Sequence, residues 1–121
     1  MTTQTVDTVN KVLGFGALGF GLAGMLAPAA LRRSYGMTAD SPELTYLGRM
    51  WGTRTAMVGA LSLAAGTDEE RKRITALAVA MNAFDSLTAA STAGLPPTTR
   101  AMGAMTSAGF AAAGAYSLMS S

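Results

Sequence analysis

Four stretches of the chain are dominated by apolar residues and are separated by short polar connections. Residues 12–31 and 101–121 contain no charged side chain at all. A helix rises about 1.5 Å per residue, so either run could cross a hydrocarbon layer about 30 Å thick. Residues 1–7 are polar, and we expect them to fray. The pattern predicts four helices, over residues 9–31, 43–66, 69–93 and 99–118.

The polar connections carry signals for the start and end of helices. Ser41-Pro42-Glu43 provides a capping serine, a proline at the first helical position and an acid in the first turn. Thr67 is followed three residues later by Glu70, which is the spacing of a capping box. Short connections favour antiparallel neighbours. The predicted fold class is therefore all-α, a four-helix antiparallel (up-down-up-down) transmembrane bundle that forms a single domain over residues 1–121.

Small residues recur at helical spacing within the first two predicted helices. The stripes comprise Gly14, Ala17, Gly21, Gly24 and Pro28 in the first helix, and Gly48, Gly52, Ala56 and Gly59 in the second. Faces of this kind let helix backbones approach closely in a membrane. They predict close helix packing, and they also favour a homo-oligomer or a larger membrane complex as the protein's assembly.

Composition supports a membrane location. Charged residues make up 13% of the chain, against about 25% in soluble domains, which is too few to cover the outside of a soluble bundle. The mean hydropathy of +0.31 is low for a membrane protein, because 24 Ala and 14 Gly stand where Leu and Ile are more usual. We expect a multi-pass protein of a bacterial inner (plasma) membrane, with the lipid bilayer as its first partner.

A secretory signal peptide is the rival interpretation of the first apolar segment. Ala27-Pro28-Ala29 resembles a small-residue cleavage site. Against this interpretation, the apolar stretch is longer than the usual core of about 7–15 residues, and Lys11 is its only cation.

The chain contains no Cys and no His. This absence excludes disulfides, thiolate metal sites, Cys–His nucleophile pairs and imidazole acid–base chemistry. We therefore expect no metal and no cofactor. The net charge of +2 rests on a few scattered cations, which is too sparse for binding nucleic acid.

Two charges within the predicted spans, Arg54 and Asp85, are the candidate catalytic residues. We take residues 44–66 and 72–94 as the membrane-embedded parts of the second and third helices. Arg54 then lies roughly 1.5 Å from the middle of the membrane, and Asp85 lies roughly 3 Å from it. Because neighbouring helices are antiparallel, both offsets fall on the same side. A lone charge at this depth costs upwards of about 2.5 kcal/mol, so the register predicts an ion pair.

Four further polar residues are candidates for a ligand pocket around this pair. Asn82 lies one helical turn before Asp85 and Ser86 lies beside it. Tyr46 and Arg49 lie toward the mouth of the same side. The alternative is that the ion pair is purely structural and fixes the register of helices that have few bulky side chains.

The second predicted helix also carries a recognisable motif. Arg49-Met50-Trp51-Gly52-Thr53-Arg54, followed by Gly59 and Leu61, resembles the R-x-x-G-x-R…G-L stretch of a family of small uncharacterised four-helix membrane proteins, loosely similar to the DoxX-like group. An acidic residue in the third helix, here Asp85, fits the same pattern. The resemblance implies a four-helix membrane fold and says little about activity. Some small membrane proteins of this general appearance act in biosynthesis on lipophilic epoxides or polyenes, and that chemistry enters here as an analogy.

Three functions follow from these features. The first is a structural or accessory membrane protein in which the Arg54–Asp85 pair stabilises the bundle. The second is an intramembrane hydrolase or isomerase acting on a lipophilic small molecule, with Asp85 as acid, base or nucleophile and Arg54 stabilising developing negative charge. The third is a transporter or proton relay, which a single ion pair supports least.

Overall fold

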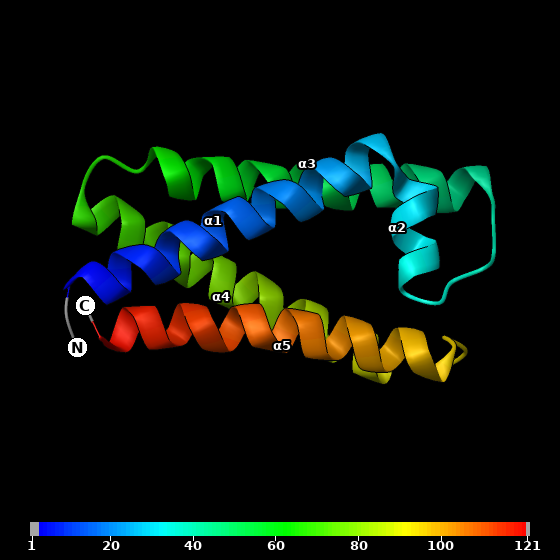
Figure 1. Ribbon diagram of the computed structural model, residues 1–121. Helices are drawn as coiled ribbons and strands as arrows, with labels where there is room; N and C mark the ends of the chain where they lie inside the picture. The colour runs from blue at the N-terminus through cyan, green and yellow to red at the C-terminus, as the bar shows by residue number, and fades with distance from the viewer. Residues whose placement is uncertain (1–2, 121) are drawn as a thin grey trace.

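The computed structural model describes residues 3–120 and is helical throughout, with no strand in this part of the chain (Figure 1). The all-α prediction is confirmed, but the described residues form five helices rather than four. They are α1 (Thr3–Leu26), α2 (Pro28–Ser34), α3 (Pro42–Ala64), α4 (Asp68–Ser91) and α5 (Pro97–Met119). The bounds of α3, α4 and α5 lie within two residues of the predicted ones.

The first predicted helix differs from the structure at both ends. It begins at Thr3 instead of fraying up to residue 7, because Val6 is buried and the Asp7 carboxylate lies 3.4 Å from Arg71 on α4. It ends at Leu26, because Ala27 leaves the helical conformation (φ −140°, ψ 58°) before Pro28. Proline is favoured at the first position of a helix, so the chain restarts as α2, which turns across the end of the molecule (Figure 1).

Capping side chains fix the two helix starts that the sequence indicates. The Ser41 hydroxyl accepts a hydrogen bond from the Leu44 N–H at 3.1 Å, and the Thr67 hydroxyl accepts one from the Glu70 N–H at 3.1 Å. The Glu70 carboxylate reaches back to accept from the Gly66 N–H at 3.0 Å. These bonds satisfy backbone donors that a helix start would otherwise leave unpaired.

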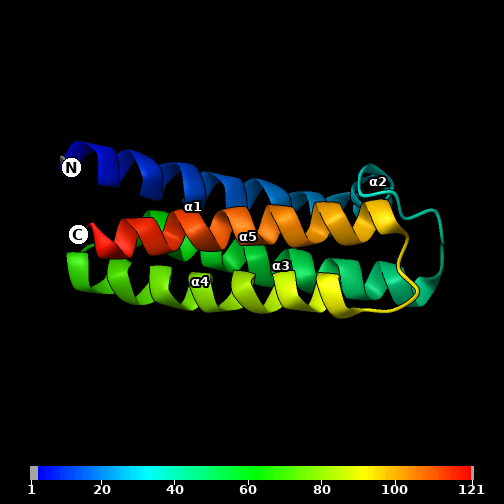
Figure 2. The ribbon, with the colours of Figure 1, turned by 90° about the horizontal axis from the view of Figure 1, so that it is seen from below.

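The four long helices form two antiparallel pairs. The first hairpin consists of α1 and α3, joined through α2, and the second hairpin consists of α4 and α5 (Figures 1 and 2). Within each hairpin the helices pack along their length, whereas the two hairpins touch each other only sparsely. The start of α1 and the end of α5 lie at the same end of the molecule (Figure 2).

Glycines bring α1 and α3 into backbone contact. A Cβ added at Gly52 would lie 2.6 Å from the carbonyl oxygen of Gly21, and one added at Gly59 would lie 2.5 Å from the Leu18 nitrogen. A Cβ added at Gly21 would overlap the backbone of Ala56. The predicted close packing of the small-residue stripes is confirmed for this hairpin.

Two segments are long and apolar enough to cross a membrane, Gln4–Leu26 in α1 and Asp68–Ser91 in α4. Few of the residues in their most apolar windows are buried inside the protein, 17% in α1 and none in α4. This finding suggests association with a membrane. The uncharged run in α5 is not among the segments found in the described residues.

Candidate functional site

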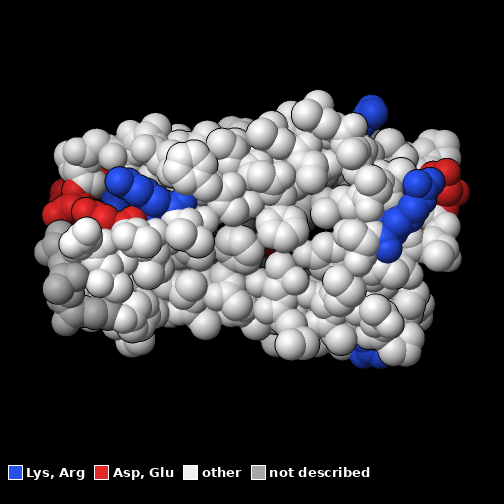
Figure 3. Space-filling model, viewed as in Figure 1, with Lys and Arg blue, Asp and Glu red and all other residues white. Residues whose placement is uncertain are grey.

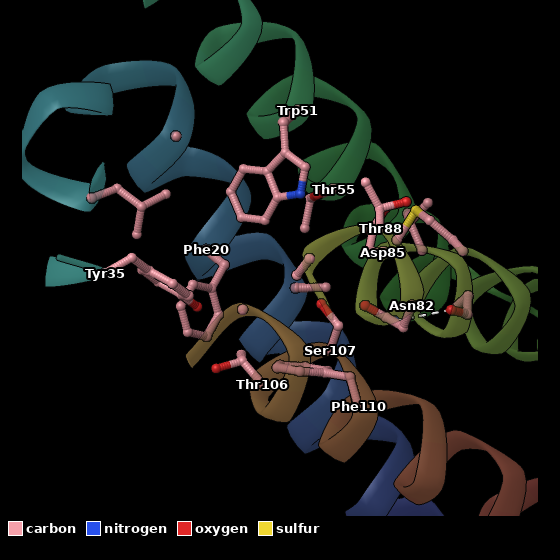
Figure 4. Close-up of a pocket in the computed structure, with 18 of the residues that line it drawn as sticks. Phe20, Tyr35, Trp51, Thr55, Asn82, Asp85, Thr88, Thr106, Ser107 and Phe110 are labelled. Atoms are coloured by element: carbon pink, nitrogen blue, oxygen red, sulfur yellow. Dashed lines mark hydrogen bonds between the residues drawn. The ribbon is translucent and has the colours of Figure 1, made fainter. Parts of the chain in front are cut away.

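A cavity of about 410 Å³ lies where the two hairpins face each other. All five helices contribute to its lining, and most of the side chains are apolar or aromatic. Figure 4 shows how these side chains surround the cavity. The labelled residues are Phe20 from α1, Tyr35 after α2, Trp51 and Thr55 from α3, Asn82, Asp85 and Thr88 from α4, and Thr106, Ser107 and Phe110 from α5.

Aromatic rings and polar bonds bridge the two hairpins around this cavity. Phe20 and Phe110 meet edge to face, with ring centroids 6.0 Å apart. At one end the Ser117 hydroxyl donates to the Asn10 side-chain oxygen at 2.6 Å. At the other end the Thr99 hydroxyl donates to the Tyr35 carbonyl at 2.6 Å. The hairpins are therefore joined at a few points and leave a space between them.

The structure brings Arg54 and Asp85 together as the helix register predicts. The Arg54 Nη2 atom lies 2.9 Å from Asp85 Oδ2, across the boundary between α3 and α4. Asp85 lines the cavity and its side chain is 23% exposed, whereas Arg54 lies outside the lining with its side chain 42% exposed. The carboxylate thus stands between the cavity and the guanidinium group that compensates its charge.

A hollow is visible in the middle of one face of the molecule, with a small patch of acidic atoms at its base (Figure 3). Among the described residues, Asp85 is the one acidic side chain that lines the cavity. The carboxylate is therefore placed where it can meet a molecule that occupies this space.

Asn82 and Ser86 make hydrogen bonds that do not involve the ion pair. Asn82 lines the cavity, and its Nδ2 donates to the Ala78 carbonyl, one turn back on α4, at 2.9 Å. Ser86 donates to the Ala104 carbonyl at 2.8 Å and so ties α4 to α5. Of the two, only Asn82 is placed to contact a ligand.

Tyr46 and Arg49 lie apart from the cavity. They line a shallow depression at the start of α3, together with residues 40–42 and Thr45. Tyr46 is 65% exposed. The face of α3 that carries Gly48, Trp51 and Thr55 points into the cavity, so residues 46 and 49 point away from it. Their predicted place in a ligand pocket around Asp85 does not agree with this geometry.

Thr55 is a cavity residue that the sequence analysis missed. It lines the cavity and is 7% exposed, and its hydroxyl has no hydrogen-bond partner within residues 3–120. A buried hydroxyl left unpaired costs about 1–3 kcal/mol. The position follows Arg54 directly, and only the rotation of α3 about its axis reveals that it faces inward.

Arg32 is the second missed residue, because the sequence places it in a polar connection. In the structure α2 carries it back against the other helices, where it is 7% exposed and lines the cavity. Pro28 is the residue of the sequence that could have indicated this position. Proline is favoured at the first position of a helix, so a second helix starting at Pro28 would contain Arg32.

The described residues contain no cluster of acidic side chains that could hold a metal ion. Comparison of the chain with family models, curated proteins and solved structures gives no match. The similarity to the DoxX-like group stays a prediction.

Proposed function

We propose that this protein is a four-span membrane protein whose cavity holds a lipophilic small molecule. The four long helices have 23 or 24 residues, which corresponds to about 35 Å and suits a hydrocarbon layer of about 30 Å. In this arrangement α2 lies at one membrane surface, and the alternating long helices form the transmembrane bundle that the sequence predicts.

The outer surface supports this placement. Large apolar side chains of α1 and α4 are exposed, among them Leu26 (79%), Phe84 (70%) and Phe15 (63%). On the face in Figure 3 the charged side chains gather at the two ends of the molecule, and the broad band between them is uncharged apart from the acidic atoms at the base of the hollow. A soluble monomer rarely exposes so much contiguous apolar surface, whereas lipid would cover it favourably.

The observation that carries the proposed binding function is the cavity with Asp85 in its wall. Its volume of about 410 Å³ falls within the range of about 300–1,000 Å³ for small-molecule sites, which combine apolar walls with a few convergent polar groups. Asp85 and Thr55 are such groups. Arg54 offsets the cost of placing the Asp85 carboxylate in an apolar setting, so the carboxylate is kept available to accept a hydrogen bond from a ligand.

A second candidate function, catalysis on the bound molecule, follows from the same carboxylate. Asp85 faces the space that a substrate would fill, and a positioned carboxylate can act as a general acid or base. Asp85→Asn keeps the size of the side chain and removes that capacity. Normal turnover of a substrate by this variant would exclude the catalytic role while leaving the binding function intact.

Filling the cavity provides the test of the binding function. Ser107→Phe places a ring into the cavity, and Ala108→Phe places the same ring on the exposed side of α5. We expect native mass spectrometry of protein released from gently extracted membranes to show a bound lipophilic molecule on wild type and on Ala108→Phe, and its loss from Ser107→Phe. If none of the three proteins carries or takes up a lipophilic molecule, the accessory or structural function is favoured instead.

A further inference from the structure

Arg32 is a buried cation at one end of the cavity. Its side chain is 8% exposed, and its only ion pair within the described residues joins Nη2 to Asp40 Oδ1 at 3.3 Å. Asp40 itself is turned to the outside, with 77% of its side chain exposed. A guanidinium group in so enclosed a position is compensated by a single, largely solvated carboxylate.

Two of the three guanidinium nitrogens of Arg32 find no partner in the part of the chain that the structure describes. Nε and Nη1 of Arg32 are buried and have no hydrogen-bond partner within residues 3–120. A buried charged group that is incompletely hydrogen-bonded is costly, and arginine donors are suited to carboxylate and phosphate oxygens. Asp40 occupies Nη2 alone, so Nε and Nη1 lack an oxyanion that would accept from them.

Arg32 lies well away from the polar group in the middle of the cavity. Its Nη1 atom is 3.9 Å from the position that a Cβ on Gly48 would occupy. Gly48 precedes Arg54 by six residues on α3, a rise of about 9 Å toward the start of that helix. The unpaired donors thus mark one end of the cavity, and Asp85 marks its middle.

The rest of the cavity is long and mostly apolar, although Asp85, Thr55 and Arg71 also line it. Its lining follows α3 from Leu44 to Ser62, a distance of about 27 Å along the helix. The volume of about 410 Å³ lies near the lower end of the range of about 300–1,000 Å³ for ligand sites. A long space of modest volume suits one extended hydrocarbon chain better than a bulky ring system or two chains.

From these observations we infer that the ligand is a single-chain amphiphile with an oxyanion head, and that Arg32 binds the head while the chain extends past Trp51 toward Asp85. This inference rests on the proposed binding function and adds the chemical class of the ligand. A fatty carboxylate and an alkyl phosphate share this chemistry, and the experiment distinguishes them.

Trp51 provides the means of detection, because it is the one tryptophan of the chain and it lines the cavity. We would titrate the detergent-solubilised protein with a fatty acid brominated in mid-chain, with its methyl ester, and with an alkyl phosphate brominated in mid-chain, and measure quenching of Trp51 fluorescence. Competition by the unbrominated analogue at constant micelle composition separates binding in the cavity from partition into the micelle.

We expect one of the two anionic probes to bind wild type at least about 10-fold more tightly than the ester, since hydrogen bonds to a charged group contribute about 1.5–3 kcal/mol. Arg32→Gln should weaken anion binding about 10-fold to 100-fold and leave ester binding unchanged. Arg32→Lys should retain most of the affinity. Arg33→Gln, at the exposed neighbouring position, should behave as wild type, and Asp40→Asn should bind the anion more tightly because it removes the competing carboxylate.

Equal affinity of wild type for ester and for both anions would overturn the inference, as would unchanged anion binding in Arg32→Gln. If Arg32→Gln fails to fold, the ratio of anion affinity to ester affinity in wild type is sufficient to test the inference, because equal affinities would overturn it. Absence of competitive quenching by every probe would instead contradict the proposed binding function itself. The two failures are thus distinguishable.

Discussion

Arg54 on α3 and Asp85 on α4 join the two hairpins near their middle, with Nη2 and Oδ2 2.9 Å apart. The hairpins touch each other sparsely, so this ion pair is one of the few contacts that hold them together. It also fixes the carboxylate at the wall of the cavity. The same two side chains can therefore stabilise the fold and present a polar group to a ligand.

The coupling between these two side chains can be measured with a double-mutant cycle. Arg54→Gln and Asp85→Asn should each lower the free energy of unfolding by about 2–3 kcal/mol, because in the proposed membrane placement each leaves a lone charge at mid-membrane depth. The double variant should lose less than the sum of the two, since it leaves no uncompensated charge. Unfolding in mixed micelles of increasing denaturing-detergent fraction, followed by circular dichroism, gives these values. Additive losses would show that the two charges do not interact.

The backbone contact between α1 and α3 gives a second prediction. Gly21→Ala should destabilise the protein by about 1–3 kcal/mol, because the new methyl group overlaps the backbone of Ala56. The matched control is Gly19→Ala two residues away, where an added Cβ meets nothing within 4 Å. That substitution should be neutral or stabilising by up to about 1 kcal/mol, because glycine weakens a helix interior. Equal effects at both positions would contradict the close packing of this hairpin.

Features that depend only on spacing along a helix were predictable from the sequence. The pairing of Arg54 with Asp85 follows from 1.5 Å of rise per residue and antiparallel neighbours. Close packing through the stripes that hold Gly21 and Gly52 follows from small residues recurring at helical spacing. The Ser41 cap follows from local hydrogen-bond chemistry. None of these inferences requires knowledge of how far apart the hairpins lie.

The cavity and Arg32 could not be predicted in the same way. The volume between the hairpins depends on side-chain packing over the whole interface, and no local pattern encodes it. The rotation of α3 about its axis decides that Thr55 faces inward while Tyr46 and Arg49 face outward. Arg32 reaches the cavity only because α1 ends before Ala27 and the chain restarts as α2 at Pro28. From the sequence, one helix that continues to residue 31 and two helices that meet at Ala27 are equally regular.

The contact between Thr99 and Tyr35 gives a third prediction. Thr99 is 5% exposed, and its hydroxyl donates to the Tyr35 carbonyl at 2.6 Å, which ties the start of α5 to the end of α2. Thr99→Val keeps the shape and should lower the free energy of unfolding by about 1–3 kcal/mol, because the part-buried Tyr35 carbonyl loses its donor. Thr98→Val, at the exposed neighbouring position, should change it by less than about 0.5 kcal/mol. The same detergent-unfolding assay measures the stability of both variants. Equal losses in Thr99→Val and Thr98→Val would show that the hydrogen bond to Tyr35 does not stabilise the protein.

The fourth prediction concerns the four membrane spans that we propose. The chain has no cysteine, so a single introduced thiol reports the side of the membrane on which it lies. Thr38→Cys, between α2 and α3, and Ala93→Cys, between α4 and α5, should react with a membrane-impermeant maleimide from the same side. Gly66→Cys, between α3 and α4, should react from the opposite side, because α3 and α4 would each have crossed the membrane. Labelling of intact cells or spheroplasts, compared with labelling after lysis, distinguishes the sides. If all three positions react from one side, α3 and α4 do not span the bilayer, and the apolar surface of these helices must be covered by another protein chain instead of by lipid.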